Sequence, residues 1–330
     1  MKKKVVFAGH DLKFATGLIN DLKLKPDIEV KIDKWDSHDA HDEEFSEKCL
    51  EWADVIFCEW GLGNAVWYSK YKKSNQKLLV RMHRQELETF YPNKFVLENI
   101  NKIIAISPYI FEEFYRKFKF PRKKMQMIFN YVDMSKYTLT KLEGSQYNIG
   151  MIGISPKLKR IDIALDIFER LWEKDNRYKL YAKGRMPSEY NWIWNNDEQR
   201  QYYEEQFSRI EKSNWGKNVI FSGFGSDVNE WLENIGFILS TSDYESFHLA
   251  VAEGMASGAY PIIRNWDGVR TIYKKDWIFN SIDDAVDKIV KYNENEVMQK
   301  IDQSRSLNEF VSNNFSLTKA TNEIYKIIMS

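Results

Sequence analysis

Two glutamates with the spacing of a binding site lie in the segment Ser242–Ile263, which reads SDYESFHLAVAEGMASGAYPII. Glu245 precedes a stretch with helical apolar spacing, and Glu253 lies inside that stretch. Apolar runs flank the stretch on both sides, so the pattern predicts a strand–helix–strand unit whose helix ends near Gly258. The two carboxylates are therefore expected around the N-terminus of a helix that joins two buried strands.

A helix start of this kind can bind an anion. The N–H groups of Ser246, Phe247 and His248 are expected in the first turn, where they have no partners within the helix and the helix dipole favours negative charge. With a diphosphate there, Glu253 is placed to accept hydrogen bonds from the two hydroxyls of a ribose. Glu245 then lies beside the group on the far phosphate. The pattern describes a nucleotide-sugar site, although two solvated glutamates would give the same spacing.

The segment resembles the signature of retaining glycosyltransferases with the GT-B fold, in particular glycosyltransferase family 4. In that family a Ser…Glu–small–Phe–Gly–Leu run is followed by Glu-Ala-Met-Ala-x-Gly-x-Pro. The same frame here reads Ser242…Glu245-Ser246-Phe247-His248-Leu249, then Glu253-Gly254-Met255-Ala256-Ser257-Gly258 and Pro261. Two positions depart from it, His248 in place of glycine and Gly254 in place of alanine.

The resemblance implies a hexosyltransferase that takes a sugar from a UDP- or GDP-type nucleotide diphosphate sugar with retention at the anomeric carbon. It implies a glycan, lipid-linked or polymer acceptor, as in the synthesis of bacterial surface polysaccharides or glycoconjugates. It also implies that no metal or other cofactor is needed, and no Asp-x-Asp motif lies in the middle of the chain. Glu245 is expected to steady the sugar and its cationic transition state.

Lys159 follows a predicted strand that ends near Gly153 and precedes a predicted helix that begins near Arg160. A lysine at this place adds a cation to a second anion-binding helix start, although a solvated lysine is the simpler interpretation of the residue alone. In family 4 a Gly-Arg-x(4)-Lys-Gly run clamps the donor diphosphate. Gly153 and Lys159 match it, but Ile154 stands at the arginine and Arg160 at the second glycine. The candidates to supply the missing charge are Arg160, Lys157 and Arg185.

His83 comes directly after a predicted strand in LLVRMHRQE. A neutral imidazole at a strand end can bind a sugar hydroxyl or the departing phosphate, and a structural histidine is the alternative. The resemblance implies that His83 faces the donor sugar. Its neighbours Arg81, Arg84 and Glu86 are placed either to bind the acceptor or to form a solvated turn.

Two further turns follow predicted strands. The resemblance implies that the turn at Gly9 brings the backbone close to the donor phosphate and the acceptor. Only one glycine is present there, so His10 and Asp11 are expected to add side-chain contacts. Gly223, in VIFSGFGSDVNEWL, resembles the family's glycine at the edge of the nucleotide base.

Short apolar strands alternate with longer amphipathic stretches along the whole chain, which predicts an α/β protein with parallel sheets. Strands are expected near 4–8, 29–32, 54–58, 78–82, 102–106 and 126–129, and again near 148–152, 179–182, 219–222, 235–240, 259–263 and 277–279. Two such series predict the GT-B architecture, with two doubly wound Rossmann-like domains facing each other across a ligand cleft.

The domain boundaries follow from the same pattern. Residues 1–138 are expected to form an acceptor-side domain, and residues 148–312 a nucleotide-sugar donor domain. Residues 139–147 are polar and lack periodicity, which is typical of a linker. The resemblance implies that the last helix, in residues 313–330, crosses back to the first domain.

The composition excludes several classes of protein. The 330 residues include 48 basic and 48 acidic side chains, so the chain has no general attraction to nucleic acid. No apolar run reaches the roughly 20 residues of a membrane-spanning helix. The basic start MKKKVVFAG has too short an apolar part for a signal peptide. Two cysteines, Cys49 and Cys58, fit neither a disulfide framework nor a zinc site, so a cytoplasmic location is expected.

Basic and aromatic residues alternate in Arg116–Lys124, which lies in the run YRKFKFPRKK. Such a stretch can dock onto the anionic inner face of a membrane, although a solvated helix end and loop is the simpler interpretation. Two other functions also remain open. One is a sugar-nucleotide epimerase with the same fold, for which no clear acid/base set is present. The other is a non-catalytic GT-B subunit that supports a partner glycosyltransferase.

Overall fold

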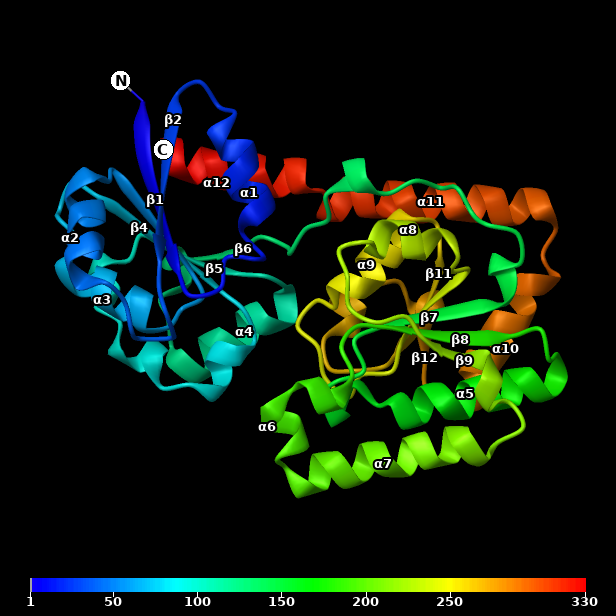
Figure 1. Cartoon of the computed structure of the whole chain (residues 1–330). Coiled ribbons are helices and arrows are strands. Elements are labelled where there is room, and N and C mark those ends of the chain that lie inside the picture. Colours follow the sequence, from blue (N-terminus) through cyan, green and yellow to red (C-terminus); the bar gives the residue numbers. More distant parts are fainter. Residues whose placement is uncertain (1) are drawn as a thin grey trace. The chain divides into compact units, whose positions relative to one another are not determined.

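The computed structural model describes residues 2–330, which divide into two compact units (Figure 1). Unit 1 consists of residues 2–133 and 314–330, and unit 2 consists of Met134–Asn313. Each unit is built around one six-stranded parallel sheet. Within the described residues, none of the helices is long and apolar enough to cross a membrane.

The sheet of unit 1 has the strand order β2-β1-β3-β4-β5-β6. Its strands are β1 (Lys3–Gly9), β2 (Ile28–Lys34), β3 (Val55–Glu59), β4 (Lys77–Met82), β5 (Lys102–Ala105) and β6 (Met125–Met127). Its helices are α1 (Thr16–Lys23), α2 (Glu43–Trp52), α3 (Gly63–Tyr71), α4 (Pro108–Phe118) and α12 (Leu317–Met329). The strand order reverses between β1 and β3, which places a crevice at the carboxyl ends of these two strands.

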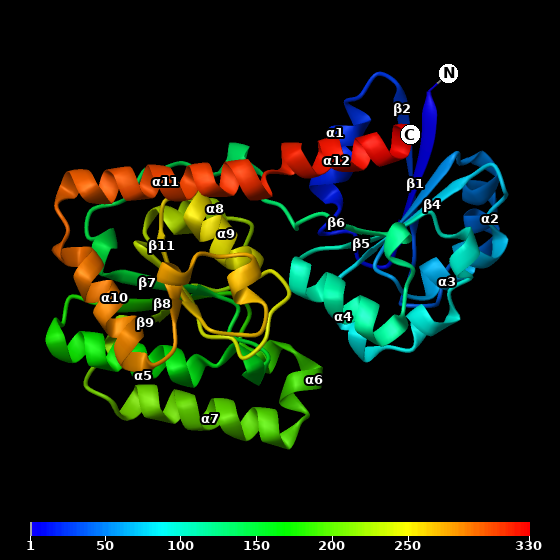
Figure 2. The same cartoon turned by 180° about the vertical axis from the view of Figure 1, so that it is seen from behind.

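Alternate residues of the unit 1 strands face opposite layers of helices. Val6 and Ile56 face the layer of α2, α3 and α4, whereas Val5 and Phe57 face α1 and α12. Helix α12 offers apolar residues at helical spacing to this second layer, and Figure 2 shows it, in red, beside α1. A backbone bridge between Val132 and Ser316 leads the chain into α12. The helix near the end of the chain therefore completes the core of unit 1.

The sheet of unit 2 has the strand order β12-β11-β10-β7-β8-β9. Its strands are β7 (Asn148–Ile152), β8 (Lys179–Lys183), β9 (Val219–Phe221), β10 (Phe237–Ser240), β11 (Tyr260–Arg264) and β12 (Ile278–Phe279). Its helices are α5 (Ile161–Lys174), α6 (Asn191–Trp194), α7 (Asp197–Lys212), α8 (Val228–Glu233), α9 (Leu249–Ala256), α10 (Ile282–Glu294) and α11 (Val297–Phe315), whose last two residues belong to unit 1. This is the Rossmann order, and its switch point lies between β7 and β10.

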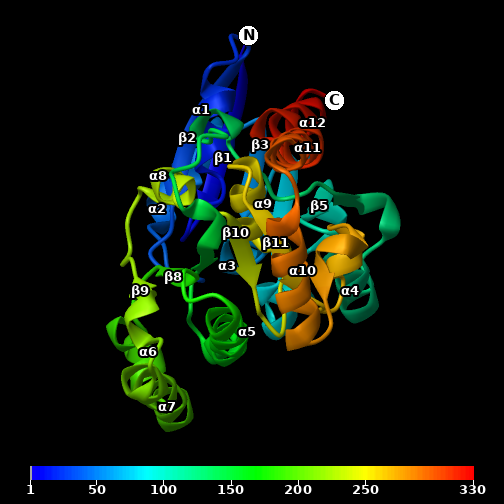
Figure 3. The same cartoon turned by 90° about the vertical axis from the view of Figure 1, so that its right-hand side faces the viewer.

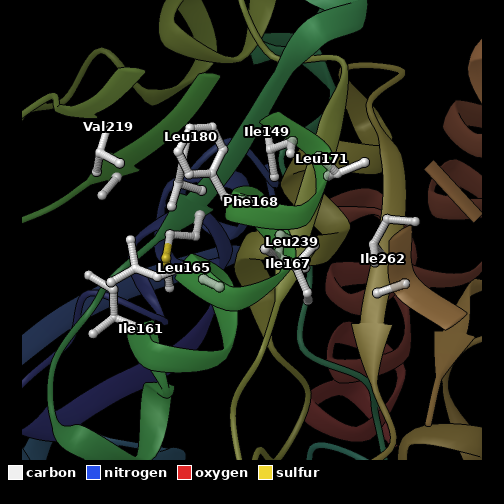
Figure 4. Close-up of a cluster of buried hydrophobic side chains, with 14 of the residues drawn as sticks. Ile149, Ile161, Leu165, Ile167, Phe168, Leu171, Leu180, Val219, Leu239 and Ile262 are labelled. Atoms are coloured by element: carbon white, nitrogen blue, oxygen red, sulfur yellow. The ribbon is translucent and has the colours of Figure 1, made fainter. Parts of the chain in front are cut away.

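The main core of unit 2 lies between the sheet and α5, where Phe168 and Leu171 pack against strand residues such as Ile149 and Leu239 (Figure 4). Ile238 faces the opposite way, toward α8. Figure 3 shows α5 and α8 on different sides of the strands. The unit is therefore doubly wound, as the apolar runs of its strands predict.

All twelve predicted strands are present, and most of their ends agree to within one or two residues. The segment 139–147, which the sequence predicts as a linker, packs against unit 2. Lys141 Nζ donates to the carbonyls of Leu232 and Ile235 at 2.7 and 2.8 Å, and the N–H of Leu142 donates to the Glu233 carbonyl at 2.9 Å. Burial lowers the pKa of Lys141 to about 7. The segment is polar because it satisfies carbonyls at the end of α8.

Candidate functional site

Two loops meet at the switch point of unit 2. The loop after β7 includes a 3₁₀ turn, η7 (Lys157–Lys159), and the loop after β10 runs to His248. The N–H of Asp243 donates to the Leu158 carbonyl at 2.9 Å, and the Thr241 hydroxyl donates to the Lys159 carbonyl at 2.7 Å. These bonds fix the two loops to each other at the carboxyl ends of β7 and β10, which is where ligands bind in open α/β sheets.

Lys159 and Glu245, which the sequence predicts as site residues, are in direct contact across these loops. Lys159 Nζ lies 2.5 Å from Glu245 Oε1, and the Ser242 hydroxyl donates to the same oxygen at 2.8 Å. Burial raises the pKa of Glu245, but the attraction of Lys159 and the hydrogen bonds from Lys159 and Ser242 oppose it, and the pKa is lowered. The Lys159 side chain is 20% exposed and the Glu245 side chain is 13% exposed. The result is an ionised carboxylate and a cation that a ligand can reach.

His248 lies beside this pair and shapes the loop before α9. Its φ of 59° is left-handed, a conformation that glycine adopts most easily and that cannot continue a helix. Its Nδ1 lies 2.6 Å from Ser240 Oγ, and its Nε2 lies 3.7 Å from Glu245 Oε1. Burial lowers the pKa of His248 to about 4, so the ring is neutral at neutral pH.

The expected position of the helix start was wrong by a few residues. Helix α9 begins at Leu249, so Ser246, Phe247 and His248 form the loop before it and not its first turn. The left-handed backbone at His248 is the cause. The Tyr273 hydroxyl lies 3.1 Å from the Phe247 carbonyl and holds this loop in place.

Glu253 lies one turn into α9, as predicted. The Tyr137 hydroxyl donates to Glu253 Oε1 at 2.9 Å. Burial raises the pKa of Glu253 to about 7. The carboxyl is therefore held in a place where it is protonated in part of the molecules at neutral pH, and partners for its charge would favour ionisation.

The three candidates for the missing cation differ in their contacts. Lys157 forms an ion pair with the exposed Glu198 at 2.9 Å. Arg160 binds Asp162 at 2.7 Å and Asp243 at 3.0 Å. The Arg185 guanidinium lies 4.8 Å from the centre of the exposed Phe224 ring. Ile154, at the position of the family's arginine, is 3% exposed and belongs to the main core.

Three glycines with positive φ follow three adjacent strands. Gly153, Gly184 and Gly223 follow β7, β8 and β9, with φ of 79°, 133° and 66°. The N–H of Gly153 donates to the Lys183 carbonyl at 2.8 Å, and that of Gly184 donates to the Gly223 carbonyl at 2.9 Å. These turns keep side chains away from the carboxyl edge of the sheet, so a ligand can approach the backbone.

In unit 1, His83 follows β4 as predicted and is only 4% exposed. Its Nε2 lies 2.8 Å from Glu59 Oε1, at the end of β3. Trp60 and Phe14 cover the ring, with centroids 4.1 and 5.2 Å away. Since the buried Glu59 carboxylate is an acceptor, the geometry assigns the proton to Nε2 and leaves Nδ1 as the acceptor of the neutral ring.

The two interpretations of Arg81 and Glu86, acceptor contact or a solvated turn, were both wrong. Arg81 is 1% exposed and donates to Glu59 at 3.2 Å and to the side-chain Oδ1 of Asn130 at 2.7 Å. Glu86 is fully buried and accepts backbone N–H groups, including that of Gly61 at 2.8 Å, and burial raises its pKa. Partners distant in sequence hold both groups inside the unit.

Gly9, His10 and Asp11 form the turn after β1, at the carboxyl edge of the unit 1 sheet. A Cβ on Gly9 would lie 2.7 Å from the Glu59 carbonyl oxygen, so this close approach requires glycine. Burial lowers the pKa of His10. Asp11 forms an ion pair with Lys13 at 3.0 Å.

Arg84 lies on a different turn, after β4, and forms an ion pair with Glu88 at 2.5 Å. The structure thus places the acceptor-side candidates on two loops of unit 1.

The basic residues of Arg116–Lys124 are partly engaged in the structure. Arg122 forms a bidentate pair with Glu112 at 2.9 and 2.7 Å, and Arg116 pairs with Glu113. Lys124 Nζ donates to three main-chain carbonyls. Part of the positive charge of this stretch is therefore neutralised by its own helix.

Sequence reasoning missed several partners of the site residues. Glu59 and Ser240 end their strands, so their position at a strand end was a usable signal. Tyr137 and Tyr273 gave no signal, because they reach the site from distant segments. Among residues 2–330, no group of three or more His, Cys, Asp and Glu side chains is placed to hold a metal ion.

Comparison with known proteins agrees with this arrangement. The family described as "Glycosyl transferases group 1" matches residues 140–309, which is just over half of the chain and most of unit 2. The poly(ribitol-phosphate) alpha-N-acetylglucosaminyltransferase of Staphylococcus aureus (strain COL) is 24% identical over 214 residues. That match covers 62% of this chain and 40% of the relative, so the chain spans less than half of that protein.

Solved structures share the fold at low identity. Anabaena HepE in complex with UDP and glucose has a TM-score of 0.72 and 13% identity, with 99% of both chains covered. A glycosyltransferase from Rickettsia africae has a TM-score of 0.74 and 16% identity, with 100% of this chain and 99% of that chain covered. TarM has a TM-score of 0.63 and 18% identity, covering 84% of this chain and 55% of that one. Two Rossmann-like units and these neighbours show the GT-B fold.

The family match lies over unit 2, the unit that brings Lys159 and Glu245 together at its switch point. The chain therefore belongs to the glycosyl transferases of group 1.

Proposed function

We propose that this enzyme transfers a hexose from a nucleotide diphosphate sugar to a carbohydrate-containing acceptor, with retention at the anomeric carbon and without a metal ion. The observation that carries the proposal is the contact of Lys159 with Glu245 at the switch point of unit 2. Glu253 lies one turn further along α9. Lys159 then matches the diphosphate of one ligand, Glu245 its sugar and Glu253 its ribose.

Lys159 changes partner when the donor binds. Its ammonium moves from Glu245 to the diphosphate, next to the backbone at Gly153, where an anion can come close. Glu245 then accepts hydrogen bonds from the sugar hydroxyls, while Ser242 continues to orient it. Because the ion pair is only partly exposed, the exchange replaces one charge partner by another and leaves neither charge buried alone.

Retention follows from attack on the same face as the departing group. The bond between the anomeric carbon and the phosphate oxygen breaks, and a bond forms from the acceptor oxygen to that carbon. The acceptor's proton passes to the departing phosphate oxygen. Lys159 stabilises the negative charge that develops on the diphosphate, and Glu245 stabilises the positive charge on the sugar.

The nucleotide contacts belong to unit 2. Glu253 is the proposed partner of the ribose hydroxyls, which would favour its ionised form over the half-protonated state that burial imposes. The turn at Gly223 is the proposed edge of the base site, where Arg185 and Phe224 lie. Arg185 is also our candidate for the second diphosphate cation, because Lys157 and Arg160 already bind carboxylates. A UDP donor is favoured, since the HepE neighbour is in complex with UDP.

The acceptor is proposed to bind at unit 1. His10, Asp11 and Arg84 lie on loops at the carboxyl edge of its sheet, and His83 is the proposed contact to the donor sugar. A glycan or a polyol-phosphate polymer of a bacterial surface is the proposed acceptor class. Support comes from the relative that is named for poly(ribitol-phosphate).

A cytoplasmic location with contact to the inner face of a membrane is a secondary proposal. It rests on Lys119 and Lys123, because the other basic side chains of this stretch already bind carboxylates or main-chain carbonyls. In a sedimentation assay at physiological salt, the protein should pellet with vesicles that contain phosphatidylglycerol and should stay in the supernatant with vesicles of phosphatidylcholine. Equal recovery with both vesicles would remove this proposal.

The donor is identified by thermal shift and calorimetry with UDP, GDP, ADP and CMP and their sugar conjugates, in the presence of EDTA. A nucleotide that binds the folded state raises the melting temperature by mass action. We expect a shift with UDP and UDP-sugars that EDTA does not remove. A shift that needs added Mg²⁺ would overturn metal independence, and no shift with any nucleotide would overturn the donor site.

A further inference from the structure

A cavity of about 250 Å³ lies within unit 1, apart from all of the residues assigned above. Its walls come from the loop after β2, from α3 and from a 3₁₀ turn, η2 (Tyr91–Lys94). The loop is fixed to α3, because the Gly63 N–H donates to the His38 carbonyl at 2.9 Å. Neither His83 nor the turn at Gly9 lines it.

One wall of this cavity is held rigid by a buried carboxylate. Asp33 Oδ2 accepts hydrogen bonds from Trp35 Nε1 at 2.8 Å, Ser46 Oγ at 2.8 Å and Tyr68 Oη at 2.7 Å. The His41 ring stacks on Trp35, with 3.7 Å between ring centres and 7° between planes. These two rings therefore have fixed positions before any ligand arrives.

The same network sets the tautomer of His41. Ser46 has one hydroxyl hydrogen, which it gives to Asp33, so its oxygen accepts from His41 Nδ1 at 2.7 Å. Nε2 is then the acceptor of the neutral ring. The wall thus combines an aromatic face with a hydrogen-bond acceptor.

Other lining residues carry exposed aromatic rings. Tyr71 is 53% exposed and Phe90 is 54% exposed, and Trp67 lies 5.0 Å from Tyr71 between ring centres. Exposed rings that line a cavity suit the C–H faces of a sugar ring, since each ring offers area and fixed geometry at low entropic cost. The volume lies near the lower end of the about 300–1,000 Å³ typical of ligand pockets, which suits one ring-sized group.

Cations outnumber carboxylates among the lining residues. Lys70 and Lys94 are both exposed at the rim, and Lys94 Nζ lies 4.3 Å from the centre of the Phe90 ring. The lining carboxylate, Asp39, accepts a hydrogen bond from the Tyr91 hydroxyl at 3.0 Å. Two lysines beside stacked rings are complementary to a sugar that carries a phosphate.

We propose that this cavity, defined by Trp35, His41, Trp67, Lys70, Tyr71 and Phe90, is an accessory site that binds a phosphate-bearing saccharide of the acceptor chain. It holds a part of the chain that does not react. This inference rests on the proposed function, because it assumes a carbohydrate acceptor, but it concerns a different place in the molecule. A site of this kind raises the local concentration of the reacting end.

The test is titration of the full chain by calorimetry with pairs of oligosaccharides, each phosphorylated and unphosphorylated, built on glucose, mannose and N-acetylglucosamine. At least one phosphorylated member should bind more tightly than its neutral partner. Phe90→Ala should weaken binding of both members about tenfold, as loss of one stacked ring predicts. Lys70→Gln should weaken only the phosphorylated member, and added salt should have the same effect.

Matched variants control for nonspecific effects. Phe45→Ala removes a ring that is 40% exposed on α2, and Lys73→Gln removes an exposed lysine just after α3. Neither residue lines the cavity, so both variants should bind like wild type. Equal losses in Phe90→Ala and Phe45→Ala, equal affinity for phosphorylated and neutral members, or no saccharide binding would each overturn the proposal.

UDP binding to the same samples separates this inference from the donor site. UDP affinity should be unchanged in Phe90→Ala and Lys70→Gln, since both residues lie in unit 1 and the proposed nucleotide contacts belong to unit 2. Absence of UDP binding in wild type, with saccharide binding intact, would overturn the proposed function alone. Loss of UDP affinity in Phe90→Ala would mean that the cavity binds a nucleotide, which overturns the saccharide site.

Discussion

Each unit has a glutamate and a cation at the carboxyl end of a strand next to its switch point, but the two pairs differ in exposure. In unit 1, the side chains of Glu59 and Arg81 are 0% and 2% exposed. In unit 2, those of Glu245 and Lys159 are 13% and 20% exposed. Two ion pairs of a glutamate with a cation, one at strand ends and one in the loops after the strands, therefore have different access to a ligand.

The difference lies in how many partners each cation has inside the protein. Arg81 also binds the Asn130 side chain at 2.7 Å and the Phe14 carbonyl at 2.9 Å, so its donors are used for internal contacts. Lys159 binds Glu245, and the three glycine turns leave the edge around it open. The pair of unit 1 maintains structure, whereas the pair of unit 2 is arranged to exchange partners.

Removing the buried cation should have the largest effect. Arg81→Met leaves Glu59 as a buried charge without its main partner, so we expect a loss of about 3–5 kcal/mol of stability in unit 1. Urea denaturation followed by the tryptophans of unit 1 measures this loss. Arg84→Met, on the exposed neighbour, is the control and should change stability little. Equal stability of both variants would mean that the pair of unit 1 is not structural.

Removing the accessible cation should affect turnover and not folding. Lys159→Ala should unfold like wild type, because Glu245 keeps the Ser242 hydrogen bond and can still reach water. The rate of sugar transfer should fall about 10²-fold or more, since one preorganised charge contact in the transition state is lost. Lys157→Ala is the control. A rate close to that of wild type would transfer the role of Lys159 to Arg160 or Arg185.

Removing the ribose carboxylate should weaken nucleotide binding while the fold is kept. Glu253→Ala removes a charge-assisted hydrogen-bond acceptor, which is worth about 1.5–3 kcal/mol, so UDP should bind more than tenfold more weakly. Calorimetry with UDP measures the change, and the melting temperature checks the fold. Glu233→Ala, at the end of α8, is a control. Unchanged affinity with normal melting would show that the ribose assignment is wrong.

The smallest effects concern pH, where Glu253 and His248 oppose each other. The pKa of Glu253 is raised from 4.5 to about 7, so its contribution to stability is lost as pH rises through about 7. The pKa of His248 is lowered from 6.5 to about 4, so its contribution is present above 6.5 and is lost as pH falls toward 4. Between about pH 4.5 and 6.5, the loss of stability from Glu253 as pH rises and the gain from His248 cancel in part.

Single variants separate the two contributions to the change of stability with pH. Glu253→Gln should leave a protein that loses stability on acidification below pH 6.5. His248→Gly, which suits the left-handed backbone, should leave one that loses stability as pH rises from 4.5 to 7. Urea denaturation at a series of pH values measures both. If either variant keeps the wild-type pH profile, the corresponding residue does not titrate as described.

The strands could be predicted from the sequence, because apolar runs mark them. Lys159 and Glu245 were each predicted as site residues, but their contact depends on the strand order, which the sequence pattern does not give. The burial of Arg81 and Glu86 could not be predicted, because their partners lie far away in the sequence. Without those partners, a charged residue type indicates a position exposed to solvent. The contact of Lys141 with α8 was hidden for the same reason. Local patterns determine the elements, and long-range polar contacts decide which charged residues are buried.

Helix α12 has a consequence for the synthesis of the chain. The apolar face formed by Val5, Phe7 and Phe57 is covered in part by Ile324 and Ile328, and all of unit 2 lies between these residues in the sequence. During translation, the part of this face that α1 does not cover therefore stays exposed until unit 2 has been made. Contacts between such distant segments form slowly, and uncovered apolar strands promote aggregation. A nascent chain held before Leu317 should consequently bind chaperones through the first sheet that it makes.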